Sequence, residues 1–559
     1  MALALPYAAN AQFADNNIEQ NRAQERERIL RQQQEKTRDE LRPAPPTPKA
    51  AKLAKEERCE VVNQVGLKVI AGDPSRVSDW DWALKALDGP DHDDSPLRRC
   101  IGPAGIDLLT QRMQDALVAR GYTTTRVLLE QQNLEATHAL TLTVIPGRVR
   151  AIRFAEPVSP RGNAWNALPI KPGDMLNLRD MEQAIENFRR VPSAQAEIVV
   201  EPVQGIPGRS DLVIRYQQAQ PFRTSLSLDD SGTKATGKYQ GGLTLSYDNW
   251  WTLNDLFYVS LNKGLGGGDA GERGTRGYVV HYSVPFGYWL LGATVSKSNY
   301  HQLVPGPFED NDYSGNSNSA EVKLSRIVYR NASGKTTVGL KAWKRASNNY
   351  INSTEVEPQR RVEGGWELGL GHKAFIADAI LEGNLAYKRG TGAFGSLTAP
   401  EEQNGEGTSR FALVSMDASL TVPFKIAQQK LSYTASLRGQ HHRTPLTSQD
   451  RFGIAGRHSI RGFDGESSLA GDSGWSLRNE LNIPLGDSGQ SFYIGLDHGR
   501  VSGPSTEFGV GKSLTGAVLG LRGALGKLQY DLFVGAPVKK PELFQTPRYT
   551  AGFSLNASF

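Results

Sequence analysis

The sequence lacks the features that mark several large classes of protein. It has no run of about 18 apolar residues, which excludes a transmembrane helix. Its net charge is only +5 over 559 residues, and no basic stripe with interleaved aromatics occurs, which excludes a nucleic-acid-binding surface. Cysteine is limited to Cys59 and Cys100, and His92 is the one histidine between them. Two cysteines and one histidine do not complete a zinc site.

Catalytic motifs are missing as well. Gly511-Lys-Ser513 resembles the end of a phosphate-binding loop, but Thr506 stands where that loop needs its first glycine, and a strand pattern follows instead of a helix. No serine, histidine and carboxylate share one face, as a hydrolase requires. Other pairs lie at loop borders without a completing ligand set: His441–His442, Asp229–Asp230, and Asp248 with Asp255, which we expect to be ordinary solvated acids. The sequence predicts no enzyme, no metal site and no cofactor.

The first residues indicate export. A short apolar run ends at Ala9-Asn10-Ala11, the pattern that closes a secretory signal peptide, so residues 1–11 are interpreted as its remainder; a disordered apolar tag is the alternative. Export from a bacterial cytoplasm leads to an oxidising periplasm. We therefore expect Cys59 and Cys100 to form a disulfide, which would stabilise the fold by roughly 4 kcal/mol in the chain-entropy model.

Residues 12–42 contain a charge-dense helix from about Asn17 to Arg42, supported by the i,i+4 pairs Glu27–Arg31 and Arg31–Glu35. A helix that is polar nearly all round bridges solvent or lies in a polar cavity; a disordered tail is the alternative. Four prolines follow within residues 43–58, which indicates a semi-rigid, extended linker able to span on the order of 50 Å.

Residues 59–146 and 147–220 form two similar α/β units. In the first, a strand at 60–70 precedes a helix at 105–120 and strands at 123–129 and 140–144. In the second, a strand at 149–154 precedes a helix at 177–190 and strands at 197–202 and 210–216, with Asn177 as the helix N-cap and Asp180 at N3. One order of elements repeated over roughly 80 residues indicates a tandem repeat.

From residue 221 to 559 the sequence alternates apolar and polar residues in segments of about ten. The last is the clearest, with Tyr549, Phe553, Leu555 and Phe559 separated by small polar residues. Apolar-out, polar-in segments of this length are typical of a transmembrane β-barrel. We count sixteen: 222–231, 238–248, 253–263, 275–285, 288–299, 318–331, 333–347, 359–373, 377–389, 408–423, 429–442, 471–485, 489–501, 512–524, 527–537 and 547–559.

The connections alternate in length, which supports the barrel independently. Every second connection is very short, whereas the others are long and polar, at 264–274, 300–317, 348–358, 390–407 and 443–470. Outer-membrane barrels alternate short periplasmic turns with long outer loops in this way. An even strand count places both barrel ends in the periplasm, beside the two α/β units.

The loop 443–470 carries the quartet Ile460-Arg461-Gly462-Phe463. Glycine permits a tight turn, the apolar residues need a dry pocket, and the arginine needs a fixed acceptor. We therefore expect this loop to fold inward, into the lumen of the barrel.

Taken together, these residues give a resemblance to the transporters of two-partner secretion systems, a branch of the outer-membrane superfamily with polypeptide-transport-associated (POTRA) domains. The resemblance covers nearly all of the chain after residue 11. In the α/β units it rests on Gly121-Tyr122 within Arg120–Arg126, on Pro146-Gly147 at the end of Val144–Gly147, and on Gly173 within Lys171–Asp174. Leu228–Gly232 fits the first barrel strand and its end, and Phe559 marks the barrel terminus.

The resemblance gives the quartet a partner. Ile460–Phe463 corresponds to the family's Val-Arg-Gly-Tyr, and residues 493–499 match the thirteenth strand, whose aspartate, here Asp497, pairs with that arginine. Parity agrees, because Ile494 and Leu496 face outward and so place Tyr493 and Asp497 in the lumen. The alternative is that the lumen contains many charged groups, so that an arginine there pairs with whichever acidic side chain is near.

The function implied is that of an outer-membrane transporter that recognises a large exoprotein through its POTRA domains and passes it unfolded through the barrel without ATP. Recognition would use strand addition at a sheet edge, with the second unit's helix face or strand 197–202 as candidates. The N-terminal helix would plug the lumen, and the loop would act as a latch. The expected partners are a β-helical exoprotein (a haemolysin, an adhesin or a contact-dependent toxin) and outer-membrane lipid, with a monomeric chain.

Two alternatives fit less well. An assembly or insertion factor of the same superfamily would usually carry more periplasmic units and no polar N-terminal helix. A passive solute porin would not need two α/β units.

Overall fold

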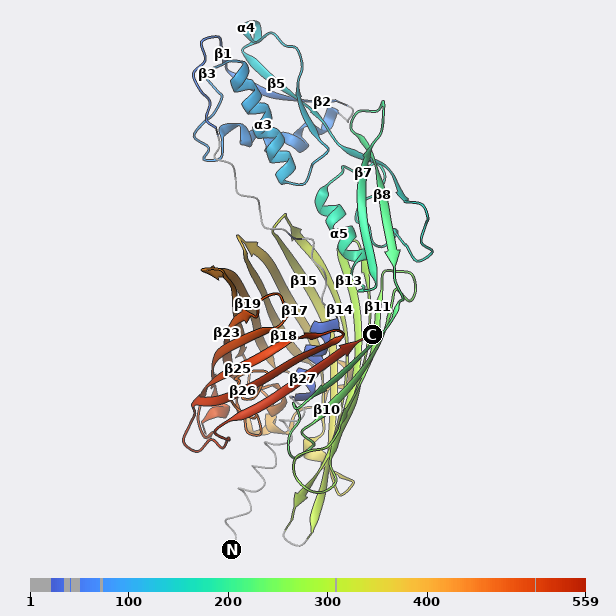
Figure 1. The fold of residues 1–559 in the computed structure, drawn as a ribbon, viewed down its shortest axis with the longest axis vertical. Helices are drawn as coiled ribbons and strands as arrows, with labels where there is room; N and C mark the ends of the chain where they lie inside the picture. Colours follow the sequence, from blue (N-terminus) through green and yellow to red (C-terminus); the bar gives the residue numbers. More distant parts are fainter. Residues whose placement is uncertain (1–21, 35–40, 42–50, 71–73, 307–308, 508) are drawn as a thin grey trace.

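The computed structural model describes residues 22–34, 41, 51–70, 74–306, 309–507 and 509–559. Two small α/β units stand in line above one end of a large β-barrel, and a helix at residues 22–34 lies within the barrel outline (Figure 1). The predicted signal peptide, residues 1–11, and most of the predicted linker lie outside the described residues. No helix in the described part of the chain is long and apolar enough to cross a membrane.

The first unit contains a three-stranded sheet of order β2-β5-β4, covered by a helix. Its main core gathers Val62, Leu109, Met113, Leu117 and Leu142, because the apolar residues of the helix recur on one face and meet the buried side of the sheet. Its elements are β1 (Glu60–Val62), β2 (Gln64–Val69), η1 (Pro74–Trp80), α2 (Asp81–Leu84), η2 (Lys85–Asp88), β3 (Arg99–Ile101), α3 (Pro103–Ala119), β4 (Arg126–Leu129), α4 (Leu134–Thr137) and β5 (Ala139–Ile145).

The second unit repeats this arrangement. Its sheet has the order β6-β8-β7, with the outer strand β6 parallel to the central β8 and β7 antiparallel to it, as β2 and β4 are to β5. Asn177 caps the helix by accepting a hydrogen bond from Arg179 N, as predicted. The elements are β6 (Arg148–Phe154), α5 (Leu178–Phe188), β7 (Ala194–Pro202) and β8 (Arg209–Gln218).

Sixteen antiparallel strands close the barrel, as the alternation predicted, and a two-residue strand, β16 (Thr354–Glu355), pairs only with β15. They are β9 (Phe222–Asp229), β10 (Gln240–Asp248), β11 (Leu256–Gly264), β12 (Gly274–Phe286), β13 (Trp289–Pro305), β14 (Asp310–Arg330), β15 (Gly334–Ile351), β17 (Arg361–Ile376), β18 (Ala379–Thr391), β19 (Ala412–Ile426), β20 (Gln429–His442), β23 (Ser473–Pro484), β24 (Ser491–Ser502), β25 (Ser513–Leu525), β26 (Leu528–Lys539) and β27 (Thr550–Ser558). The seam between β27 and β9 pairs five residues on each side.

Two predicted loops are wrong in part. Residues 348–358 include the end of β15, which pairs with β14 as far as Tyr313↔Ile351, and the short strand β16. Residues 300–317 were expected to form a long loop, but β13 and β14 continue as a ladder to the pair Pro305↔Asp310. The sequence there is polar on both faces, which resembles a loop. A sheet that extends into water also tolerates polar residues on both faces, so the hydrogen-bonded ladder continues beyond the barrel wall.

Residues 51–58, expected to be linker, pack on the first unit. Leu53 is buried in its core. The Glu56 carboxylate accepts hydrogen bonds from the backbone N–H groups of Gly102, Ala104 and Gly105 at 2.8–3.1 Å, at the start of α3. A carboxylate at a helix N-terminus satisfies donors that have no partner within the helix.

The predicted disulfide is present: Cys59 and Cys100 are bonded. It joins the segment before β1 to strand β3. Strands β1 and β3 pair with each other and form a small separate sheet.

Candidate functional site inside the barrel

The loop between β20 and β23 folds back into the lumen. Two short strands, β21 (Phe452–Ile454) and β22 (Leu469–Gly471), pair with each other and bring the segment between them inward. At its turn, Gly456 and Ile460 form an isolated bridge. This geometry delivers the quartet Ile460–Phe463 to the inner wall of the barrel, as expected from its composition.

Arg461 is held by a buried carboxylate on β24. Its Nε and Nη2 donate to the two oxygens of Asp497 at 2.8 and 2.9 Å, and its backbone N–H donates to the same carboxylate at 3.0 Å. Asp497 has no exposed surface, and the Arg461 side chain is 6% exposed. Glu480 on β23 accepts from Nη1 of Arg461. A bidentate pair with a third, backbone bond fixes both the position and the orientation of the loop.

Tyr493 lies beside this pair without bonding to it. Its hydroxyl donates to Asp531 at 2.8 Å, and its ring lies under the guanidinium groups of Arg522, at 4.0 Å, and Arg461, at 5.9 Å. Parity is as predicted: Tyr493 is buried, while Ile494 is 43% exposed on the outer face. The two guanidinium groups over the ring share Glu480 as an acceptor.

The part of the barrel wall that contacts the quartet is rich in glycine. A Cβ on Gly516 would lie 1.9 Å from the carbonyl oxygen of Arg461, and one on Gly535 would lie 2.8 Å from the Cα of Gly462. Gly462 itself has a φ of +99°, which other residues rarely adopt. We call the inward-facing set Gly495, Gly499, Gly516 and Gly535, each next to an atom of Ile460, Arg461 or Gly462, the glycine groove. Sequence reasoning missed it, because lumenal strand glycines carry no pattern that separates a docking groove from ordinary variation.

The apolar residues of the quartet occupy a dry pocket. Ile460 and Phe463 are buried with Leu514 of β25 and Phe544 of the β26–β27 loop. The rings of Phe463 and Phe544 meet edge to face with centroids 5.8 Å apart. This pocket anchors the loop by burial where Arg461 anchors it by charge.

A second arginine of the loop reaches the barrel seam. Arg457 donates to Asp230 at 2.9 Å and to the carbonyl of Phe553 at 3.1 Å. The same Asp230 oxygen accepts from Phe553 N. Asp229–Asp230, expected at a loop border, thus joins the first strand, the last strand and the loop.

The described part of the N-terminal helix, residues 22–34, lies in the lumen and contacts the wall mainly through polar groups. Glu27 and Arg31 form the predicted intrahelical pair, and Arg31 also pairs with Glu321 of β14. Ser296 of β13 donates to Glu27 at 2.8 Å. The predicted pair with Glu35 lies outside the described residues.

The helix also touches the loop. Arg22 donates to the carbonyl of Gly465, in the loop, at 2.5 Å and to that of Ser231, after β9, at 3.2 Å. Glu25 lies 3.3 Å from Arg438 on the opposite wall. Helix, loop and wall surround a cavity of about 1150 Å³.

Three motif residues of the α/β units lie at the joint between them. Gly121 has a φ of +97°, and its carbonyl accepts from Leu178 N at 2.8 Å. A Cβ at Gly121 would lie 2.2 Å from Oδ1 of Asn177. Pro146 and Gly147 form the crossing from β5 to β6. These residues hold one unit against the next.

The other two motif residues lie within the units. Tyr122 packs edge to face on Trp80, with centroids 5.2 Å apart, in the first core. Gly173, with a φ of +96°, forms a turn whose N–H donates to Val149 at 2.8 Å. Both have structural contacts.

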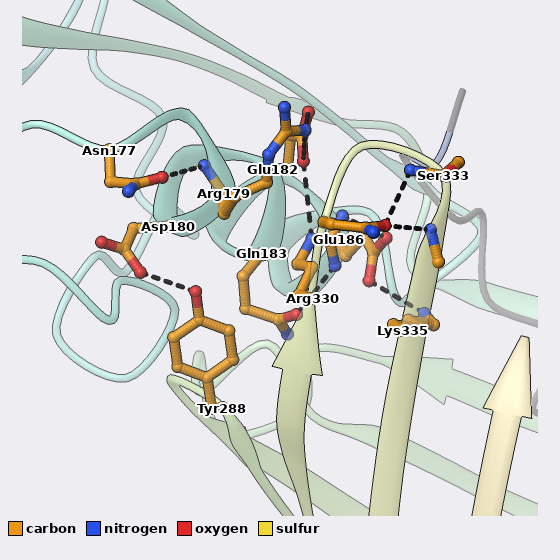
Figure 2. A network of polar contacts seen from close by, with 12 residues as sticks. Asn177, Arg179, Asp180, Glu182, Gln183, Glu186, Tyr288, Arg330, Ser333 and Lys335 are labelled. Carbon is orange, nitrogen blue, oxygen red and sulfur yellow. Dashed lines mark hydrogen bonds and ion pairs between the residues drawn. The ribbon is translucent and has the colours of Figure 1, made fainter. Parts of the chain in front are cut away.

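Helix α5 of the second unit forms ion pairs and hydrogen bonds with the barrel (Figure 2). Arg330, at the end of β14, lies 2.8 Å from Glu186, and Lys335 lies 3.1 Å from the other oxygen of that carboxylate. Tyr288 donates to Asp180 at 2.6 Å. Burial raises the pKa of Asp180, although the hydrogen bond from Tyr288 opposes the shift. The polar face of α5 is therefore occupied by the barrel.

Asp248 and Asp255, expected to be solvated, are fully buried, and that expectation is wrong. Asp248 pairs with Arg223 at 2.9 Å, and Asp255 accepts from the backbone N–H groups of Trp251 and Leu253. The reason is that the second unit covers this turn, which no local pattern reveals. No group of three or more potential metal ligands occurs among the described residues.

Phe559 lies at the seam. Its backbone exchanges two hydrogen bonds with Thr224, at 2.8 and 3.1 Å, and its ring is 60% exposed on the outer face. The terminal residue thus extends the five-residue pairing of β27 with β9.

Comparisons with known proteins agree with this architecture. The family model described as haemolysin secretion/activation protein ShlB/FhaC/HecB matches residues 208–523. A ShlB-type POTRA domain model matches residues 94–147, and a second POTRA model matches residues 148–202.

Individual relatives match over most of their length. The outer membrane transporter CdiB-2 of Burkholderia pseudomallei strain 1026b is 38% identical over 82% of this chain and 79% of its own. The hemolysin transporter HpmB of Proteus mirabilis is 25% identical over 80% and 81%. The solved structure of CdiB from Acinetobacter baumannii superposes with a TM-score of 0.85 at 29% identity, covering 98% of this chain and 99% of the other.

Proposed function

The chain belongs to the ShlB/FhaC/HecB family of outer-membrane transporters, and on that premise we propose that it secretes a large exoprotein, unfolded, through its own barrel. Its POTRA domains would bind the exoprotein in the periplasm. The helix at residues 22–34 would be a plug that leaves, and the loop carrying Arg461 would be a latch that moves. Folding of the exoprotein outside would supply direction without ATP.

The observation that carries this proposal is the polar attachment of the helix in the lumen. Arg31, Glu27 and Arg22 use ion pairs and hydrogen bonds, and the side chains of Arg31 and Glu27 are 22% and 16% exposed. Partly hydrated ion pairs contribute little net stability each. Leu30 packs against an apolar cluster, but the other contacts are polar, so the helix can withdraw with little exposure of apolar surface, which suits a plug.

The bond between Arg22 and Gly465 supports a coupling of the two lumenal elements. Departure of the helix would remove a donor from the loop segment just beyond the quartet. Arg461, paired with Asp497, would still hold the quartet against the barrel wall. We infer that plug release comes first and loosens only the loop segment around Gly465, beyond the quartet.

For the exoprotein, a free sheet edge is the remaining candidate in the second POTRA domain. Within the described residues β7 pairs only with β8, which leaves its other edge available to an added strand. The polar face of α5, the other candidate, lies against the barrel. Glu197 and Glu201 are exposed on β7 and would meet a client strand there.

Secretion is tested by co-expression with a large β-helical exoprotein, ideally one encoded beside this gene. The exoprotein is expected in the medium only when the chain is present. A photo-crosslinking residue at Glu197 on β7 should capture it, whereas one at Arg150, on the opposite edge strand β6, should not. Secretion without the chain would refute transport, and capture from Arg150 alone would place recognition elsewhere.

The plug is tested by conductance in planar bilayers. A variant lacking residues 17–42 should conduct more than the parent, because the helix no longer fills part of the lumen. An unchanged conductance would contradict the plug.

A further inference from the structure

A loop of the second POTRA domain, residues 160–168, is fastened to the rim of the barrel. Asn166 donates to the carbonyl of Pro285 at 2.9 Å and its own carbonyl accepts from Gly287 N at 2.8 Å. Asn163 donates to Thr252 at 2.7 Å. These bonds join the loop to two neighbouring turns of the barrel and fix its position.

This rigid loop presents a tryptophan outward. Trp165 is 71% exposed, although its backbone N–H is held by Asn163 Oδ1 at 3.0 Å. Its ring contacts Phe286 edge to face, with centroids 5.2 Å apart. An exposed ring held in place in this way indicates a binding surface when it belongs to a larger apolar patch.

The direction of Phe286 identifies that neighbour. On β12, His281 and Ser283 point into the lumen and are buried, so Phe286, an odd number of residues further, points to the outside of the barrel, where it is 53% exposed. The outside of this barrel is lipid. Trp165 therefore continues the lipid-facing surface onto the POTRA domain.

Other aromatic side chains lie along the same rim. Trp250 packs on the outward-facing Phe257 at 4.7 Å and lies beside Trp251, which is 64% exposed. Trp289 begins β13 on its outer face, and the guanidinium of Arg326 lies 5.0 Å from its ring. We call Trp165, Trp250, Trp251, Phe286 and Trp289 the aromatic collar. Tryptophan and arginine at one level are typical of the boundary between acyl chains and phosphates.

We propose that Trp165 is a lipid-binding residue of the second POTRA domain and inserts into the inner leaflet of the outer membrane at the level of the phospholipid headgroups. The domain is then attached to two supports, the barrel rim and the membrane. It cannot turn away from the barrel without drawing an indole out of lipid, so bending concentrates at the joint near Gly121. The proposal rests on the membrane location of the barrel, not on the identity of the exoprotein.

The test uses the full chain in vesicles of phosphatidylethanolamine and phosphatidylglycerol that contain a phospholipid with a nitroxide at the headgroup or deep in the acyl chain. An environment-sensitive fluorophore is attached at Trp165→Cys. Phe286→Cys serves as the lipid-facing reference. Ile206→Cys serves as the water-facing control, because Ile206 is 49% exposed in the turn before β8. The Trp165 probe should be quenched as strongly as the reference, several-fold more than the control, and more by the headgroup nitroxide than by the deep one.

A second variant reads the native side chain. In Trp165→Phe, the fraction of total tryptophan fluorescence quenched by headgroup nitroxide should fall relative to the parent. Quenching of the Trp165 probe at the level of Ile206, or an unchanged fraction in Trp165→Phe, would overturn the proposal.

Discussion

Two segments far apart in the sequence share the lumen, and they are held there in opposite ways. The loop is locked by Arg461 to a fully buried carboxylate and lies in the glycine groove, with Ile460 and Phe463 in a dry pocket. The helix at residues 22–34 is held by partly exposed ion pairs beside the lumenal cavity. We call the loop the fixed occupant of the pore and the helix its removable occupant. The two differ in how completely their charged groups are removed from water, more than in the number of their contacts.

The largest effect is expected where the fixed occupant loses its charge pair. Arg461→Ala leaves Asp497 buried without its main partner, which should reduce the free energy of loop opening by about 3–5 kcal/mol. Because 1.4 kcal/mol is tenfold, thiol labelling of Ser459→Cys, a buried position in the loop, should accelerate by roughly two to four orders of magnitude.

Arg478→Ala is the matched control, since Arg478 lies on the same wall but 4.0 Å from Asp497. It should change the labelling rate far less. Equal acceleration in both variants would mean that any cation near Asp497 suffices, and the loop would not be locked by a specific pair.

A smaller effect is expected from filling the glycine groove. Gly516→Val places side-chain carbon where the Arg461 carbonyl now lies, so the loop must shift at a cost of about 1–3 kcal/mol. Labelling of Ser459→Cys should rise about 10- to 100-fold. In Gly383→Val, where a Cβ meets nothing within 4 Å, the rate should remain that of the parent. An unchanged labelling rate in Gly516→Val would show that the loop does not pack against the glycine groove.

The smallest effect is expected at the removable occupant. Arg22→Ala removes the bond to Gly465 and should raise the frequency of open events in bilayers several-fold, the equivalent of about 1 kcal/mol or less. Arg28→Ala, in which the lost side chain pairs with Glu25 of the same helix, should have a weaker effect.

Salt sharpens the same contrast. Raising ionic strength from about 0.1 to 1 M shortens the screening length from about 10 to 3 Å, so open events should increase while labelling of the loop stays constant. If salt accelerates both processes equally, the two occupants do not differ in kind.

Strand periodicity was enough to predict sixteen strands and to place Asp497 and Tyr493 inside, because a period of two assigns each side chain to one face. It could not place the ends of β13 and β14, where both faces meet water. Nor could it reveal the burial of Asp248 or the exposure of Trp165. Both depend on how the second POTRA domain sits on the barrel rim, and no local pattern encodes that contact.

The groove also escaped prediction for a physical reason, since it is defined by atoms that are absent. That absence makes it a tunable element. Each of its four glycines can be enlarged by single methyl groups without adding charge or a hydrogen-bonding group, so a series from alanine to valine would vary the space left for the loop in small steps. The smallest side chain that stops transport would show how closely the loop must pack against the barrel wall between rounds of secretion.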